Sequence, residues 1–323
     1  MKAALRSKYG SGEVLSIQEV DKPTPKDNEI LVRVYAASAN RTDYHVLTGL
    51  PLFMRVFTGL FKPRLSIIGT DFAGQVEATG STVSSFKVGD KVMGFGGVFG
   101  CGSYAQYLVL PETKASKIIV TIPDSLTYEQ AAACLEGTFY AASGINQLNP
   151  KAGQKALVYG ATGAIGSSYV QFLKYYGVYT TAVCGGENEE LVRSLGADKV
   201  IDYKTKDFTK DDEQYDYVFD AIGRSSFAKC KRLLKKKGIY TSSGGVENLF
   251  LSMITPFLGG KKVPFIPPKD IKGNLGFIND LFEKRSFKPV IDRIYPLEKI
   301  AEAFNYVATG QKIGNVIITM YEI

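Results

Sequence analysis

The chain has 323 residues, 45% of them hydrophobic, with 33 glycines, four cysteines and a formal net charge of +7. This length is typical of two domains rather than one core. No apolar run approaches the about 20 residues that cross a bilayer, the N-terminus lacks a signal-peptide core, and no two cysteines form a C-x-x-C pair. We therefore expect a cytoplasmic protein with no transmembrane segment, no disulfide framework and no structural zinc lobe.

The basic residues are scattered, and only residues 229–237 form a dense run. Lys and Arg near the end of a helix interact favourably with its dipole, and Gly238 follows this run directly. We interpret the run as the solvated end of a helix, and we expect no nucleic-acid partner.

The first 117 residues show glycines and β-branched residues in strand-like alternation. The pattern predicts strands over residues 29–35, 74–79, 91–95 and 104–110. We expect this part of the chain to form a β-rich domain.

Residues 118–262 alternate between strand and helix patterns, which is typical of a doubly wound α/β domain. Beyond the first unit of this region, elements are predicted over residues 179–184, 187–195, 199–203, 215–222, 225–236 and 238–243. An amphipathic helix over 297–307 and a strand over 314–319 are expected to return to the first domain. The predicted domains are therefore 1–117 with 263–323, and 118–262.

The most informative segment is a glycine turn between a short apolar strand that begins at Lys155 and a helix that ends before Gly177. Its residues are Gly160, Ala161, Thr162, Gly163, Ala164, Ile165 and Gly166. Such glycines let the backbone approach a pyrophosphate, while free N–H groups at the helix start face the anion. The segment predicts a site for a nicotinamide or flavin dinucleotide, although an ordinary turn would have the same glycines.

The strand over 179–184 bears on which nicotinamide cofactor is used. NAD sites commonly end this strand in Asp or Glu, which binds the ribose hydroxyls, whereas here Cys184 and two glycines precede Glu187. This leaves room for the additional phosphate of NADP, with Arg193, Tyr203 and Lys204 as candidate partners. Three nearby acidic residues, Glu187, Glu189 and Glu190, oppose that preference.

Seven motifs occur in order along the chain: Asn-Arg-Thr-Asp at 40–43, Gly-Thr-Asp-Phe-Ala-Gly at 69–74, Val-Gly-Asp-Lys-Val-Met-Gly at 88–94, Thr-x-Tyr-Ala-Ala at 138–142, the glycine turn at 160–166, and residues 195–203 and 296–304. Together they resemble the medium-chain dehydrogenase/reductase superfamily, specifically its zinc-lacking quinone oxidoreductase branch. The resemblance implies an α/β fold with a Rossmann doubly wound parallel sheet and a β-rich GroES-like catalytic domain. It also implies a homodimer that transfers hydride from C4 of NADPH to an apolar quinone or α,β-unsaturated carbonyl (enone).

The chain departs from the zinc alcohol dehydrogenases of this superfamily at their metal ligands. Those enzymes have Cys where this chain has Asn40, and a His-Glu pair where it has Thr70 and Asp71. Cys134 falls where the third ligand would be, but a lone thiolate does not make the usual site of three protein ligands. We therefore expect no metal, and we interpret His45 as an ordinary surface residue.

The resemblance also suggests roles for individual residues. Asn40 and Tyr44 are the candidate catalytic residues, Asn40 as an amide donor to a developing oxyanion and Tyr44 as a possible proton donor. Asp43 and Asp71 are expected to orient their loops. The candidate cofactor-binding residues are Asn40, Thr138, Gly160, Ala161, Thr162, Gly163, Ala164, Ile165, Gly166, Cys184, Arg193, Tyr203, Ile222, Gly223, Ser243 and Gly244.

Residues 47–65 are apolar, aromatic and basic, and three interpretations stay open for them. They could wall the substrate pocket with Phe53, Met54, Phe57 and Phe61. They could form a peripheral contact with a membrane, or a helix packed between domains. A similar stretch, 249–265, is expected to lead to the edge strand of the dimer.

Two other functions compete with a zinc-independent quinone or enone reductase. One is an alcohol dehydrogenase acting on simple alcohols, which the changed ligand positions disfavour. The other is a catalytically inactive NADP-binding scaffold or sensor.

Overall fold

The computed structural model describes residues 1–97, 100–244 and 247–321, which form two compact units. Unit 1 comprises residues 1–139, 270–283 and 289–323, and unit 2 comprises 140–269 and 284–288. Compared with the domains expected from the sequence, residues 118–139 belong to unit 1, and residues 263–269 and 284–288 belong to unit 2.

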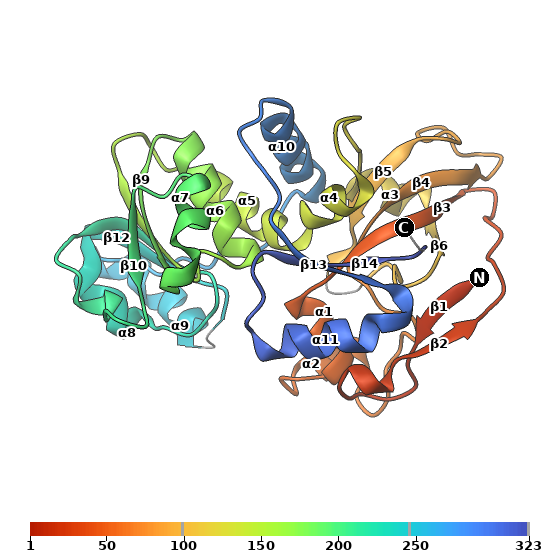
Figure 1. Cartoon of the computed structure of the whole chain (residues 1–323), viewed down its shortest axis with the longest axis horizontal. Coiled ribbons are helices and arrows are strands. Elements are labelled where there is room, and N and C mark those ends of the chain that lie inside the picture. Colours follow the sequence, from red (N-terminus) through yellow and green to blue (C-terminus); the bar gives the residue numbers. More distant parts are fainter. Residues whose placement is uncertain (98–99, 245–246, 322–323) are drawn as a thin grey trace. The chain divides into compact units, whose positions relative to one another are not determined.

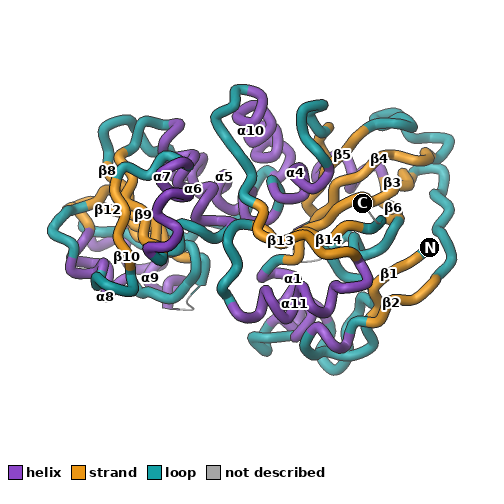
Figure 2. The backbone as a smooth tube through the Cα atoms, in the orientation of Figure 1, coloured by secondary structure: helices purple, strands orange, loops and turns teal. Residues whose placement is uncertain are grey.

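Unit 1 is built on a mainly antiparallel sheet, seen as the orange strands around the C-terminus in Figure 2. The strand order is β13-β14-β3-β4-β5-β7, with β6 paired to β3 and a separate β1-β2 pair. The bounds are β1 (Lys2–Leu5), β2 (Ser16–Glu19), β3 (Glu29–Ala39), β4 (Asp71–Thr79), β5 (Lys91–Phe95), β6 (Tyr107–Pro111), β7 (Ile119–Thr121), β13 (Ile291–Pro296) and β14 (Asn315–Thr319). Because β14 pairs with β3, the expected return of the C-terminal segment to the first domain is confirmed.

Helices pack around this sheet and lie in the connections between its strands (Figure 1). Asn40 caps α1 by accepting a hydrogen bond from the Asp43 N–H, and Gly49 ends it with a φ of 64°. The bounds are η1 (Gly12–Val14), α1 (Arg41–Thr48), α2 (Met54–Thr58), α3 (Glu112–Ile118), α4 (Tyr128–Ala133), α10 (Ile271–Glu283), η7 (Leu297–Lys299) and α11 (Ile300–Thr309), while α5 (Glu136–Leu148) begins in unit 1 and continues into unit 2.

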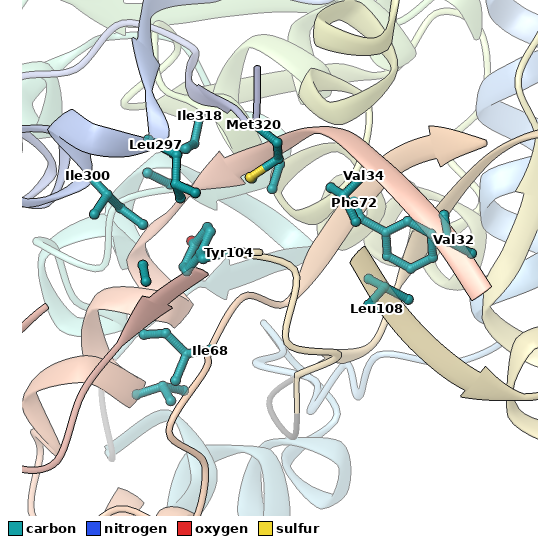
Figure 3. Packing of buried hydrophobic residues seen from close by; sticks show 14 of the residues in the cluster. Val32, Val34, Ile68, Phe72, Tyr104, Leu108, Leu297, Ile300, Ile318 and Met320 are labelled. Atoms are coloured by element: carbon teal, nitrogen blue, oxygen red, sulfur yellow. The ribbon is translucent and has the colours of Figure 1, made fainter. Parts of the chain in front are cut away.

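The core of unit 1 joins the central strands to α11. Val32 and Phe72 on the sheet, and Ile300 from α11, are fully buried in one cluster with Tyr104 (Figure 3). Tyr104 lies before β6, because its carbonyl accepts from the Ala4 N–H and its own N–H donates to the Ile68 carbonyl. The strand predicted to start at residue 104 therefore starts three residues later.

Unit 2 contains a five-stranded parallel sheet in the order β10-β9-β8-β11-β12. Its strands are β8 (Lys155–Tyr159), β9 (Tyr179–Cys184), β10 (Lys199–Asp202), β11 (Tyr215–Asp220) and β12 (Leu234–Ser242). The order reverses between β8 and β11, and ligands of such open sheets bind at the carboxyl ends of the strands at this point. The flanking helices are α6 (Ala164–Tyr175), η3 (Gly186–Asn188), α7 (Glu189–Ser194), η4 (Phe208–Lys210), α8 (Phe227–Cys230), η5 (Lys231–Leu233), α9 (Glu247–Ile254) and η6 (Thr255–Leu258).

The prediction that the basic run at 229–237 ends a helix is correct only for residues 229–233, which lie in α8 and in η5 directly after it, and it is wrong for residues 234–237. Helix α8 ends at Cys230, and β12 begins at Leu234, which is fully buried against β11. The partners of β11 jump from Leu234 to Ile239, and the intervening lysines occupy the irregular stretch between them. Burial of the leucines against the sheet outweighs the local helical pattern.

The parallel Rossmann-type sheet and the separate β-rich unit confirm the expected α/β fold class. No helix among the described residues is long and apolar enough to cross a bilayer.

Candidate active site

The glycine turn follows β8 and has little room for side chains. Gly160 has a φ of +80°, and a Cβ there would lie 2.5 Å from Cγ2 of Ile222. A Cβ on Gly166 would lie 2.1 Å from the Gly160 carbonyl oxygen. Glycine is therefore favoured at Gly160 by its positive φ and required at Gly166 by the close approach of the backbone.

Gly163 differs, because it faces open space. A Cβ there would have only the Gly160 oxygen within 4 Å, at 3.6 Å. Gly163 caps the N-terminus of α6 in extended conformation, and no side chain accepts a hydrogen bond from the first turn of the helix. An accessible helix start with free N–H groups fits a phosphate, so this turn can hold the pyrophosphate of a dinucleotide.

Asp220, at the carboxyl end of β11, organises the neighbouring loop. Its carboxylate accepts from the N–H groups of Gly223 and Ser225, both at 2.8 Å, and from the Tyr240 hydroxyl at 3.2 Å. A Cβ on Gly223 would lie 3.0 Å from Cα of Gly244, so the loops after β11 and β12 touch. The candidate cofactor residues Ile222, Gly223, Ser243 and Gly244 thus lie beside the glycine turn.

An acid from the loop after β9 pairs with a base that follows β10. Cys184 is buried, and a Cβ on Gly185 would lie 2.7 Å from the Glu187 carboxylate, so this acid lies next to the strand end. Lys204 Nζ is 2.7 Å from Glu187 Oε1, and both side chains are exposed. The predicted Arg193 is engaged elsewhere, with Glu189 at 2.8 Å, whereas Tyr203 is exposed directly after β10.

In unit 1, Asn40 is the hub of a buried polar cluster. Its Nδ2 donor lies 2.8 Å from Asp43 Oδ2, 2.9 Å from Thr70 Oγ1 and 3.1 Å from Ser38 Oγ. Its Oδ1 accepts from the Asp43 N–H at 2.8 Å. The amide is therefore saturated by protein groups, a geometry that favours positioning over direct donation to an oxyanion.

Asp43 is fully buried beneath Asn40. Asp43 Oδ2 accepts from Asn40 and Thr70 and lies 2.7 Å from the Tyr104 hydroxyl. Asp43 Oδ1 has no hydrogen-bond partner. Burial raises the pKa of Asp43 to about 7, because desolvation of the charge outweighs these hydrogen bonds. The same hydroxyl lies 2.8 Å from the Ser38 carbonyl oxygen, and its single proton cannot serve both acceptors. A protonated Asp43 satisfies both contacts, because Asp43 donates its proton to the Tyr104 hydroxyl oxygen and the hydroxyl donates to the Ser38 carbonyl.

Two more buried carboxyl groups of unit 1 are Asp71 and Glu136. Asp71 accepts from the N–H of Ser38 at 2.7 Å and from its hydroxyl at 2.6 Å, and burial together with Asp43 raises its pKa well above the ordinary value. Glu136 accepts from the Thr42 hydroxyl at 2.6 Å, and burial raises its pKa as well. Asp71 thus fixes the end of β3, as expected for a residue that orients its loop.

The other candidates of unit 1 differ in exposure. Tyr44 is half-buried against the core, and Thr138 is fully buried. His45 is half-buried rather than on the open surface, and burial lowers its pKa. Phe53, Phe57 and Phe61 are exposed, while Met54 packs against the core.

The donor chemistry at the zinc-ligand positions does not favour a metal. The amide of Asn40 and the hydroxyl of Thr70 bind each other and Asp43, and burial raises the pKa of the Cys134 thiol to about 12, so that it stays protonated. Among the residues that the structure describes, no group of three or more His, Cys, Asp or Glu side chains is placed to hold a metal.

Three residues that matter here were missed by sequence reasoning: Tyr104, Glu136 and Asp220. Each is a common polar residue that gains its role from partners distant in the chain. Tyr104 and Asp43, for example, are 61 residues apart. Only the strand-end position of Asp220 could have been noticed in the sequence.

Comparison with known protein families gives two matches. An alcohol dehydrogenase GroES-like domain matches residues 26–124, and a zinc-binding dehydrogenase domain matches residues 195–318.

Individual proteins match over nearly the whole chain. The chain is 31% identical to a chloroplast envelope quinone oxidoreductase homolog of Arabidopsis thaliana, over 98% of both chains. It is 30% identical to an NADPH-dependent alkenal/one oxidoreductase of the same plant, over 98% of this chain and 79% of the relative. The solved structure of a quinone oxidoreductase from Coxiella burnetii superposes with a TM-score of 0.87 at 24% identity, over 99% of both chains.

Proposed function

Because the chain belongs to the medium-chain dehydrogenase/reductase superfamily, in its quinone oxidoreductase branch, we propose that it transfers hydride from NADPH to a quinone or an α,β-unsaturated carbonyl. Oxidoreductase chemistry with a nicotinamide cofactor is the common property of this family. The choice of NADPH and of the acceptor is the proposal.

The observation that carries the proposal is the hydrogen-bonded pair of Asn40 and Thr70. Both side chains are neutral and engaged with Asp43, so unit 1 offers amide and hydroxyl groups where a Lewis acid would otherwise be held. An acceptor that is already electron-poor needs less polarisation, because hydride addition yields a delocalised hydroquinone or enolate anion. Quinones and enones have this property, whereas simple alcohols and ketones do not.

The residues of this chain would bind and orient the reactants. The glycine turn and the start of α6 would hold the pyrophosphate, and the bound NADPH supplies the hydride from C4. Asp43, which is bonded to Tyr104, fixes Asn40, and Asn40 in turn fixes the start of α1 and so the position of Tyr44. The proton that completes the reduction comes from water or a side chain, for which Tyr44 stays a prediction.

The preference for NADPH rests on the pair formed by Lys204 and Glu187. A 2′-phosphate would compete with Glu187 for the Lys204 ammonium group, whereas the carboxylate would accept from the ribose hydroxyls of NADH. Lys204, rather than Arg193, is the base that neighbours the end of β9 through this pair.

The homodimer and the cytoplasmic location also stay predictions.

The test is NADPH oxidation, followed by its absorbance, with a panel of quinones and enals. The proposal predicts turnover with members of both groups. Tight NADPH binding without turnover over the whole panel would favour the scaffold or sensor, and NADP-dependent oxidation of simple alcohols would favour an alcohol dehydrogenase.

A further inference from the structure

Large apolar side chains are exposed mainly in two short segments, residues 50–65 of unit 1 and residues 249–265 of unit 2, and the first holds the larger number. Of the 21 such side chains that are exposed in the described part of the chain, eight lie between Leu50 and Leu65. Phe61 is 96% exposed, and Leu52, Phe53 and Leu60 are each more than half exposed. So many exposed apolar side chains within 16 residues are unusual on a protein that has no partner there.

The inner side of this segment is held in place by hydrogen bonds. The Tyr9 hydroxyl lies 2.8 Å from the Thr58 hydroxyl and donates to the Gly59 carbonyl at 2.6 Å. Buried Arg6 donates to the Leu65 carbonyl at 3.3 Å. Met54 is the member of α2 that packs against the core. The polar anchors therefore face inward and the apolar side chains face outward, the reverse of an ordinary surface helix.

The charge of the segment is entirely positive. No Asp or Glu occurs between Tyr44 and Thr70. Lys62 and Arg64 follow Phe61 in the sequence and flank the exposed apolar residues there, whereas Arg55 lies over the Tyr9 ring on the inner side. Lys62 and Arg64 are exposed. An apolar face with a basic rim is complementary to a bilayer interface that carries anionic headgroups.

We propose that the exposed face of residues 50–65 docks on an anionic lipid bilayer, inserting the side chains around Phe61 at the level of the headgroups. A second copy of the chain is the poorer occupant. A twofold contact through this face would set its cations against the same cations of the partner, and the segment has no acid to neutralise them. The proposal does not depend on the reaction proposed above.

The experiment is flotation of the full chain with vesicles of phosphatidylcholine and phosphatidylglycerol, and with vesicles of phosphatidylcholine alone. We expect binding to the anionic vesicles that weakens as ionic strength rises, and much weaker binding to the neutral ones. No binding to anionic vesicles, or equal binding to both kinds, would overturn the proposal.

Variants locate the contact. Phe61→Ser should weaken binding about tenfold through lost apolar insertion, and the double change Lys62→Gln with Arg64→Gln about fivefold for each charge removed. The matched controls are Phe257→Ser, which removes an exposed aromatic ring of unit 2, and Lys236→Gln with Lys237→Gln, which removes two exposed charges. Both controls should bind like the parent. Thermal unfolding checks that each variant is folded.

Three results would reassign the face. Equal losses in Phe61→Ser and Phe257→Ser would place the contact elsewhere or spread it over both units. A dimer in sedimentation that Phe61→Ser dissociates would assign the face to a second copy. If Phe61→Ser alters the KM for a short, water-soluble quinone and leaves vesicle binding unchanged, the face belongs to the wall of the substrate pocket.

Discussion

Gly163 offers the sharpest test of the dinucleotide site, because a side chain fits there without disturbing the fold. Its φ of −72° is accessible to any residue, and the nearest atom to an added Cβ is 3.6 Å away. Replacing this N-cap glycine by Ala, Gln or Glu should therefore change the free energy of unfolding by about 1 kcal/mol or less. Gly166→Ala is the contrasting variant, because its Cβ would lie 2.1 Å from a backbone oxygen, and it should destabilise the protein.

The charge introduced by Gly163→Glu determines how much the affinity for NADPH falls. Two like unit charges about 5 Å apart repel by about 3 kcal/mol at an effective dielectric constant of about 20. Gly163→Gln adds a side chain of the same size without the charge. The Glu variant should therefore bind NADPH about a hundredfold more weakly than the Gln variant.

The assay is a fluorescence titration with NADPH at low and high ionic strength, alongside thermal unfolding of each variant. Salt should narrow the difference between the Glu and Gln variants, because it screens the repulsion. If Gly163→Glu unfolds normally and binds NADPH like the parent, the turn at 160–166 is not the phosphate site.

Three further predictions concern other parts of the chain. Burial raises the pKa of Asp43 from 3.8 to about 7, so the stability that this carboxyl contributes is present below about pH 4 and is lost as the pH rises through about 7. In urea unfolding, the stability of Asp43→Asn relative to the parent should therefore increase by up to about 4 kcal/mol over that range. A difference that does not change with pH would contradict the burial argument. Lys204→Gln should weaken NADPH binding about fivefold and leave NADH binding unchanged, while Glu187→Gln should favour NADPH; equal effects on both cofactors in parallel titrations would remove the pair from cofactor selection. Deleting residues 51–62 should weaken binding to anionic vesicles and leave the range of acceptors unchanged, and an altered acceptor profile in steady-state assays would assign the segment to the wall of the substrate pocket.

Much of unit 2 could be predicted because its signals are local. The apolar strand over 179–184 coincides with β9, and the glycine turn is followed by α6 as expected. These elements depend on hydrophobic periodicity and glycine conformation within a few residues. The helix predicted over 225–236 failed where burial of Leu233 and Leu234 against the sheet decides the structure.

The polar cluster of unit 1 could be predicted only in part. The resemblance identified Asn40 and Asp43, but the direction of the Asn40 amide depends on Thr70 and Tyr104, which lie 30 residues or more away. Such contacts exist only once β3, β4 and the segment before β6 have come together. The pKa of Asp43 has the same origin, because it follows from burial rather than from any neighbour in sequence.

The most direct test of the proposed function follows the hydride itself. An enal is incubated with the enzyme and NADPH deuterated at the transferable position of C4, and the product is analysed by mass spectrometry and NMR. A reductase of activated double bonds gives the saturated aldehyde with deuterium at the β-carbon. An allylic alcohol with deuterium at the former carbonyl carbon would contradict the account and identify an alcohol dehydrogenase.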